Sequence, residues 1–202
     1  MENKANQVQA EELFIGNIIN KEKDISVDEL PEMDLYMDQV ISLFESKLNG
    51  NNEKLLTKTM INNYSKDKLI GNVNKKKYTK EQILRMLIIY NLKQTLSIIE
   101  MRELFAYIKR NQISFKSIYN EIIRIKSLRG KLINSISKSF EVGIDEELSR
   151  IMLYSVLSSS FKQLSSQKLL IAVGNTSTLN HEKGNEKVAE KSKKLYVLRA
   201  RE

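Results

Sequence analysis

The amino-acid sequence predicts an all-α protein, and three observations support that fold class. The 202 residues include 7 glycines and one proline, Pro31, which is too few turn-forming residues for a sandwich or barrel of many short strands. Apolar residues make up 41% of the chain, enough for a buried core, and charged residues make up 29%. Apolar residues also recur at the spacing of helices, between residues that typically cap helix ends. We expect one or two small helical domains.

Composition also argues against several classes of protein. The chain has no cysteine, which excludes disulfides and thiolate metal sites and agrees with a cytoplasmic location. It has no run of about 18 apolar residues, so we expect no membrane span. The N-terminus is polar and acidic, without the apolar stretch of a secretory signal. We therefore expect a cytoplasmic protein.

Charge is distributed unevenly along the chain. Residues 1–53 contain 4 Lys/Arg and 12 Asp/Glu, a balance of −8, whereas residues 54–138 contain 19 and 5, a balance of +14. Residues 139–202 contain 10 and 8, a balance of +2. A central block this basic suits binding to a phosphate backbone. A general abundance of Lys, Asn and Ile would produce the same composition, so the local arrangement has to decide.

The N-terminal quarter contains one predicted helix. We expect residues 1–29 to be disordered or loosely docked, apart from a short apolar patch that begins at Leu13. This patch would be a short helix that docks on the body of the chain or on a partner, and docking within the chain is favoured. Proline is tolerated at a helix start, so Pro31 predicts the first firm boundary. Apolar residues over 33–48 then recur at helical spacing up to Asn49-Gly50, which is a helix stop.

A short second helix is predicted over 58–66, with Thr57 as its N-cap. Its few apolar residues would fix one side to the domain: Met60, Ile61 and Tyr64. Its other faces carry Lys58, Thr59, Asn62, Asn63 and Lys66. Lys can read guanine or hold phosphate, and Asn can pair with adenine through two hydrogen bonds, so this helix suits a DNA major groove. The alternative is an ordinary surface helix.

A turn and a lysine triplet follow. Residues 71–74 (GNVN) indicate a loop, and Lys75, Lys76 and Lys77 come directly after it. We expect Tyr78 to anchor this segment to the core while the lysines face outward.

Two capping boxes predict the next helices. The spacing occurs at Thr79 with Gln82 and again at Ser97 with Glu100. We expect helices over about 80–94 and 98–109, the first of them apolar enough to be the central strut of the domain.

The C-terminal part is also predicted to be helical. From Ser114 a stripe of apolar residues runs at a spacing near 3.5: Ile118, Ile122, Ile125, Leu132 and Ile136. Arg129 interrupts this stripe, and Gly130 would weaken or kink the helix. A last helix is expected over about 145–170. The stripe is either a homodimer seam or a face that packs on the 145–170 helix, and the sequence favours neither.

These elements resemble the MerR-type winged helix-turn-helix, in which a recognition helix ending in tyrosine leads to a basic wing and two further capped helices. The matching segments are, in order, 57–64, 75–78, 79–83 and 96–105. More closely, the segments LPEMDLYMDQVISLFESKL, LLTKTMINNYSK and KKKYTKEQILRMLIIYNLKQTLSI resemble a bacterial family, domain of unknown function 1836, which is regarded as MerR-like. The resemblance covers residues 30 to the mid-100s strongly, and extends to about 170 weakly.

The resemblance implies an all-α, MerR-like winged helix-turn-helix with a minimal wing, followed by a C-terminal helical region. The implied divisions are a loosely docked segment 1–29, a DNA-binding domain 30–110, a helical packing or dimerisation region 111–173 and a flexible basic tail 174–202.

Carried over by position, two groups of residues would touch DNA. Lys58, Thr59, Asn62 and Asn63 would face the groove or its phosphates, and Lys75, Lys76 and Lys77 would form the wing. Three features depart from the MerR pattern. The connection over 49–56 is long for a tight helix-turn-helix turn, Asn62 and Asn63 stand where many MerR proteins have Arg and Tyr, and the wing has no proline.

An enzyme is not expected. The only histidine, His181, lies in the polar C-terminal segment, so neither a Ser-His-Asp arrangement nor a histidine metal site is plausible. The Gly-rich phosphate-loop motifs GxxxxGK[ST] and GxGxxG are both missing. We expect no metal and no cofactor.

Two functions from different classes remain. The first is a DNA-binding transcriptional regulator with double-stranded DNA as its partner, the 58–66 helix in the major groove, and a homodimer through 114–170 as one arrangement. The second is a helical adaptor on the same fold, without DNA binding, that holds a protein partner. A salt-dependent shift with short duplex DNA discriminates between them.

Overall fold

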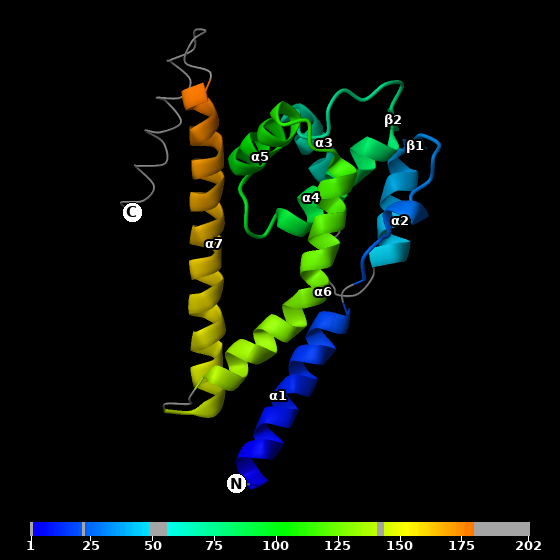
Figure 1. Ribbon diagram of the computed structural model, residues 1–202. Helices are drawn as coiled ribbons and strands as arrows, with labels where there is room; N and C mark the ends of the chain where they lie inside the picture. Colours follow the sequence, from blue (N-terminus) through cyan, green and yellow to red (C-terminus); the bar gives the residue numbers. More distant parts are fainter. Residues whose placement is uncertain (1, 22, 49–55, 141–143, 180–202) are drawn as a thin grey trace.

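A computed structural model describes residues 2–21, 23–48, 56–140 and 144–179, and these are mainly helical (Figure 1). The elements in chain order are α1 (Glu2–Lys21), a 3-10 turn η1 (Val27–Glu29), β1 (Leu35–Tyr36), α2 (Met37–Leu48), α3 (Lys58–Lys66), β2 (Lys77–Tyr78), α4 (Lys80–Leu92), α5 (Ile98–Arg110), α6 (Phe115–Ser139) and α7 (Glu146–Leu179). The predicted all-α fold class is confirmed, and the two short strands are the only sheet among the described residues.

The buried core lies in one half of the molecule. We call the described residues between 25 and 123 the head, because the continuous cluster of buried apolar side chains begins at Ile25 and ends at Tyr119. Helix α4 lies at its centre, with seven of its thirteen residues buried. We call α1, residues 124–139 of α6, and α7 the limb. In Figure 1, α1 runs beside the lower part of α6. Helix α7 stands on the left of the view, on the side of α6 away from α1.

Four predicted helix starts are confirmed by their caps. The hydroxyl oxygens of Thr57, Thr79, Ser97 and Ser114 each accept a hydrogen bond from a backbone N–H three residues later. In two of these caps a side chain reaches back: Gln82 accepts from the N–H of Thr79 at 2.9 Å, and Glu100 accepts from that of Ser97 at 2.8 Å. The predicted ends also agree closely, because α3 ends at Lys66 and α5 at Arg110.

The first predicted boundary was wrong. Pro31 does not begin a helix, and α2 begins only at Met37. Leu35 and Tyr36 instead form β1, which pairs antiparallel with β2 in the register Leu35–Tyr78 and Tyr36–Lys77. The pairing partner is about forty residues further along the chain, so helical spacing alone could not reveal it.

The N-terminal segment docks on the same chain as expected, but its helix extends over Glu2–Lys21 and is longer than the short apolar patch that we predicted. Helix α1 packs along α6, and Ile15 on its inner face is buried. After it, Ile25 and Val27 enter the core of the head, and the Tyr119 hydroxyl donates a hydrogen bond to the carbonyl of Ile25 at 2.8 Å.

Helix α6 is continuous through Gly130, where we expected a weakening or a kink. A Cβ atom built on Gly130 would lie 3.5 Å from Cδ1 of Ile19, an ordinary van der Waals distance, so α1 passes beside the glycine without requiring it. Helix α7 extends to Leu179, nine residues beyond the predicted end and into the expected tail; residues 180–202 lie outside the described part of the chain.

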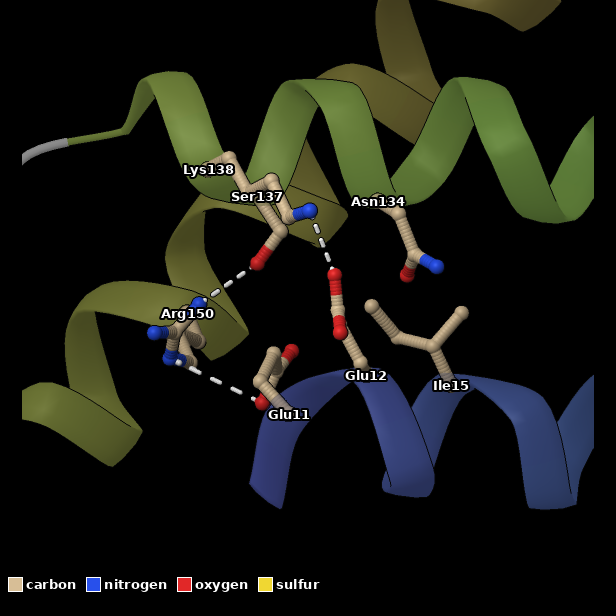
Figure 2. A pocket seen from close by; sticks show the side chains of 7 residues that line it. All are labelled: Glu11, Glu12, Ile15, Asn134, Ser137, Lys138 and Arg150. Atoms are coloured by element: carbon tan, nitrogen blue, oxygen red, sulfur yellow. Dashed lines mark hydrogen bonds and ion pairs between the residues drawn. The ribbon is translucent and has the colours of Figure 1, made fainter. Parts of the chain in front are cut away.

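Polar contacts join the three limb helices. Figure 2 shows Arg150 of α7 donating to the Ser137 hydroxyl at 2.7 Å and facing Glu11 of α1, with 3.7 Å between the nearest nitrogen and oxygen. The Arg150 side chain is only 10% exposed. Burial opposes its charged form, but the hydrogen bond to Glu146 and the charge of Glu11 outweigh it and raise the pKa of Arg150. An outer pair, Lys138 and Glu12, lies beside this cluster at 2.5 Å.

The predicted α6 stripe is divided between two environments. Ile118 and Ile122 pack against the core of the head, whereas Ile125 and Leu132 are 51% and 60% exposed. Ile136 lines an apolar groove between α1, α6 and α7. The helix that covers α6 in the head is α4, so packing on the 145–170 segment does not account for Ile118 and Ile122.

Within the described residues, no helix combines the length and the apolar character required to cross a membrane.

Candidate nucleic-acid interface

Helix α3 presents one polar face to solvent. Ile61 is fully buried and Tyr64 is 7% exposed, and both pack into the core of the head. At about 100° per residue, the five residues selected from the sequence fall within one arc of roughly 140° on the opposite side. All five are exposed: Lys58, Thr59, Asn62, Asn63 and Lys66. The face is therefore held outward by two buried anchors.

The amide side chains on this face are available to a ligand. Asn62 and Asn63 are exposed, and neither side chain forms a hydrogen bond with any other part of the chain that the structure describes. An amide group offers two donors and one acceptor oxygen, which is the set that reads the edge of adenine.

The lysine triplet forms a tight turn. The N–H of Lys77 donates to the carbonyl of Asn74 at 2.9 Å, and Lys75 and Lys76 between them have φ of 48° and 61°. Positive φ at both central positions is the pattern of a type I′ hairpin turn, which Asn and Gly normally occupy. We call residues 74–77 the wing turn. Both central lysines are exposed, as expected from the sequence.

The start of α2 brings the wing turn and α3 together. Through the β1–β2 pairing, the Lys77 ammonium lies 5.0 Å from the ring centroid of Tyr36. Two residues further along, Asp38 forms an ion pair with Lys58 at 2.6 Å. The first residue of α3 and the last residue of the wing turn thus contact the same three-residue segment, 36–38.

Acidic residues from the first quarter of the chain neutralise some of the basic block. Asp38 pairs with Lys58 and Glu32 with Lys80 at 2.6 Å, whereas Glu29 pairs with Lys47, outside that block, at 2.8 Å. The hydrogen bonds from these lysines lower the pKa values of Glu32 and Glu29. By contrast, no ion pair joins Lys66, Lys75 or Lys76 to any carboxylate of the described residues.

Lys58 therefore differs from the other selected lysines. Its pair with Asp38 is exposed on both sides, and an exposed pair of this kind exchanges readily for another anion. Sequence reasoning missed this pair and the strand that positions it. The acidic charge of 1–53 was visible, but no local pattern assigned Asp38 to Lys58.

The described residues contain no cluster of three or more His, Cys, Asp or Glu side chains that could hold a metal ion.

Comparison with known proteins gives one match. No curated protein and no solved structure matches the chain significantly. A family model described as "Domain of unknown function (DUF1836)" matches residues 25–122, nearly the same residues as the head. Over residues 25–122, the chain is similar to the DUF1836 family.

Proposed function

We propose that the head is a DNA-binding module and that the protein is a transcriptional regulator of MerR-like winged helix-turn-helix type. In this proposal, α3 enters the major groove and the wing turn contacts backbone phosphates. Asn62 and Asn63 face the base edges, with Thr59 beside them, while Lys58 and Lys66 flank them at the two ends of the helix.

The observation that carries the proposal is the shared contact of α3 and the wing turn with residues 36–38. Lys58 touches Asp38 and Lys77 touches Tyr36, so the start of the helix and the basic turn are neighbours on one surface. A surface of this kind can contact bases and phosphates of one duplex at the same time. The unpaired lysines Lys75 and Lys76 supply the positive charge that phosphates attract.

The wing turn can be neutralised without changing its shape. Asn-Gly is the preferred pair at the centre of a type I′ turn, so Lys75→Asn with Lys76→Gly removes two charges and keeps the backbone conformation. If both lysines contact phosphate, the variant should bind every duplex more weakly. The slope of log K against log salt should fall in magnitude by about 1.8, or roughly 0.9 per lost contact.

Two controls isolate this effect. Lys75→Arg with Lys76→Arg keeps the charge and should keep the salt slope. Circular dichroism and thermal melting should show that all variants fold. Equal slopes for the Asn-Gly variant and the wild type would remove the wing turn from the interface, and failure of the wild type to bind any duplex at low salt would refute the whole proposal.

A second candidate function is a helical adaptor that binds a protein, and the exposed limb favours it. The outer side of α7 carries Ile151, Met152 and Val156 at 55–64% exposure. The groove between α1, α6 and α7 is mostly apolar and includes Phe14, Leu157 and Phe161. Contiguous exposed apolar surface is typical of protein interaction sites.

The same surface suits a homodimer, which would bring two copies of α3 to paired half-sites on DNA. Light scattering at tens of micromolar protein tests this arrangement. A dimer that Val156→Glu converts to a folded monomer would support it, whereas a wild-type monomer that binds a duplex with one protein per site would contradict it. A protein that binds no duplex would leave the adaptor as the better reading.

A further inference from the structure

A second concentration of positive charge lies at the C-terminal end of α3. A groove between the loop after α3, α4 and α5 is lined by four cations, Lys68, Arg85, Arg102 and Lys109. None of these residues belongs to the polar face of α3 or to the wing turn.

Two of the cations are held in fixed positions. Arg85 lies with its guanidinium 4.1 Å from the ring centroid of Phe115 and donates twice to Glu81, at 2.7 and 3.2 Å. Arg102 forms an ion pair at 2.9 Å with Asp67, the residue that caps the end of α3. The second contact ties the groove directly to α3.

The other two cations are unpaired. Lys68 and Lys109 are exposed and form no ion pair with a carboxylate of the described residues. The two carboxylates that contact lining residues, Glu81 and Asp67, balance only the two arginines. The groove therefore has an excess of about two positive charges, in a position open to solvent.

The position of the groove relative to α3 indicates what its positive charge contacts. Helix α3 has nine residues and is about 13 Å long at 1.5 Å per residue. Its first residue adjoins the wing turn through residues 36–38, and its last turn adjoins the groove through Asp67. The major groove of B-DNA is about 12 Å wide and is bordered by a phosphate backbone on each side. The two ends of α3 are therefore separated by about the distance between those backbones.

We propose that this groove is a second phosphate-binding site, which contacts the backbone of the duplex on the side of the major groove opposite to the wing turn. Lys68 and Lys109 contact phosphate oxygens, and Arg102, held by Asp67, adds positive charge beside the same strand. This inference rests on the proposed DNA-binding function and adds residues that the sequence did not point to.

The test removes the two unpaired charges. Lys68 has φ of 60°, a conformation that asparagine tolerates, so Lys68→Asn with Lys109→Gln should fold normally. Binding is measured against short duplexes of random sequence over a range of salt concentrations. The salt slope should fall in magnitude by about 1.8, with a similar loss on all sequences.

A matched control removes two charges elsewhere. Lys131→Gln with Lys162→Gln neutralises two exposed lysines on α6 and α7, outside the groove, and should leave the slope unchanged. If the groove variant behaves like this control while the Asn-Gly wing variant still lowers the slope, the groove inference is overturned and the proposed function stands. If the wild type binds no duplex, the proposed function itself fails.

Free phosphorylated molecules share the chemistry of a DNA phosphate, and a second arm separates the two sources. Inorganic pyrophosphate is titrated into the wild type while the amide signals of Gly71 and Asn72, both in the groove lining, are followed by NMR. Saturable shifts that disappear in Lys68→Asn/Lys109→Gln, with an unchanged DNA salt slope, would assign the groove to a small ligand and overturn the inference.

Discussion

The head and the limb are each stabilised by a different kind of interaction. In the head, α4 is surrounded by other elements, and Ile83, Met86, Leu87, Ile88 and Ile89 are fully buried. In the limb, Ile15 is the only buried apolar side chain among the described residues. Its helices meet instead through the cluster around Arg150 and through the ion pair of Lys138 with Glu12. The head has a closed core, whereas the limb leaves much of its apolar surface in solvent.

This difference assigns the stability of the fold to the head and leaves the limb surface available for binding. A closed apolar core of this extent accounts for the folding of the head. Exposed apolar residues on the limb contribute little to folding of the isolated chain and are free to bind something else. The match of the DUF1836 family model to residues 25–122 follows the same division, since it ends where the packed core ends.

The largest expected effect compares one apolar deletion in each region. Ile88→Ala removes a fully buried side chain from α4 and should lower the free energy of unfolding by about 2–5 kcal/mol. Leu164→Ala removes a side chain of α7 that is 57% exposed and should change it by less than about 0.5 kcal/mol. Urea denaturation measures both. Similar losses would mean that the limb is covered, as in a tight dimer.

The next effect concerns the polar contacts of the limb. Arg150→Met leaves the partly buried carboxylates of Glu11 and Glu146 without their cation and should destabilise the limb by about 3 kcal/mol. Lys138→Gln breaks only an exposed pair and should cost under about 1 kcal/mol. Hydrogen exchange should show faster opening of α1 in the Arg150 variant, with the amides of α4 unchanged. Equal acceleration in α4 would show that head and limb unfold as one unit.

Sequence reading by the head should be smaller in energy but specific. If Asn62 contacts a base edge, Asn62→Ala should weaken binding to the cognate site by about 1–3 kcal/mol and leave binding to random duplexes nearly unchanged. Asn63→Ala is the matched comparison on the same face. Selection of bound duplexes from a random pool, followed by titration, gives both values. Equal losses on cognate and random DNA would assign these asparagines to positioning.

The smallest effect lies where the two regions meet. Burial raises the pKa of Glu100, but hydrogen bonds from Ser166 and Ser97 outweigh it, so the pKa is lowered from its ordinary value of 4.5. A carboxylate with a lowered pKa stabilises the fold above its unfolded pKa, and the contribution disappears as pH falls through the folded value. Ser166→Ala should raise the pKa of Glu100 and reduce this acid sensitivity. Carboxyl NMR titration measures the pKa, and an unchanged value would show that Ser166 does not hold α7 to α5 in solution.

The sequence predicted what depends on neighbouring residues. In each of the three predicted caps, at Thr57, Thr79 and Ser97, a hydroxyl accepts from a backbone N–H three residues away, so the signal and the structure occupy the same few positions. The exposed face of α3 followed from the spacing of Ile61 and Tyr64 in the same way. Local signals of the same kind predicted that the lysines of the wing turn face outward.

What depends on distant residues could not be predicted. Strand β1 exists because Leu35 and Tyr36 meet Lys77 and Tyr78, and α1 is ordered along α6, more than a hundred residues away. The ion pair of Asp38 with Lys58 and the groove that includes Lys109 are also products of the tertiary fold. No periodicity within a single segment contains that information.

Helix α7 is hydrogen-bonded to other helices at two separate points. Near one point Tyr154 bonds to Glu11 of α1, and near the other Ser166 bonds to Glu100 of α5. These residues are twelve positions apart, which is about 18 Å along a stiff helix. Between them, Phe161 and Leu164 are more than half exposed. These two hydrogen bonds therefore attach α7 to α1 in the limb and to α5 in the head, and loss of either one would weaken the attachment of α7 at that end.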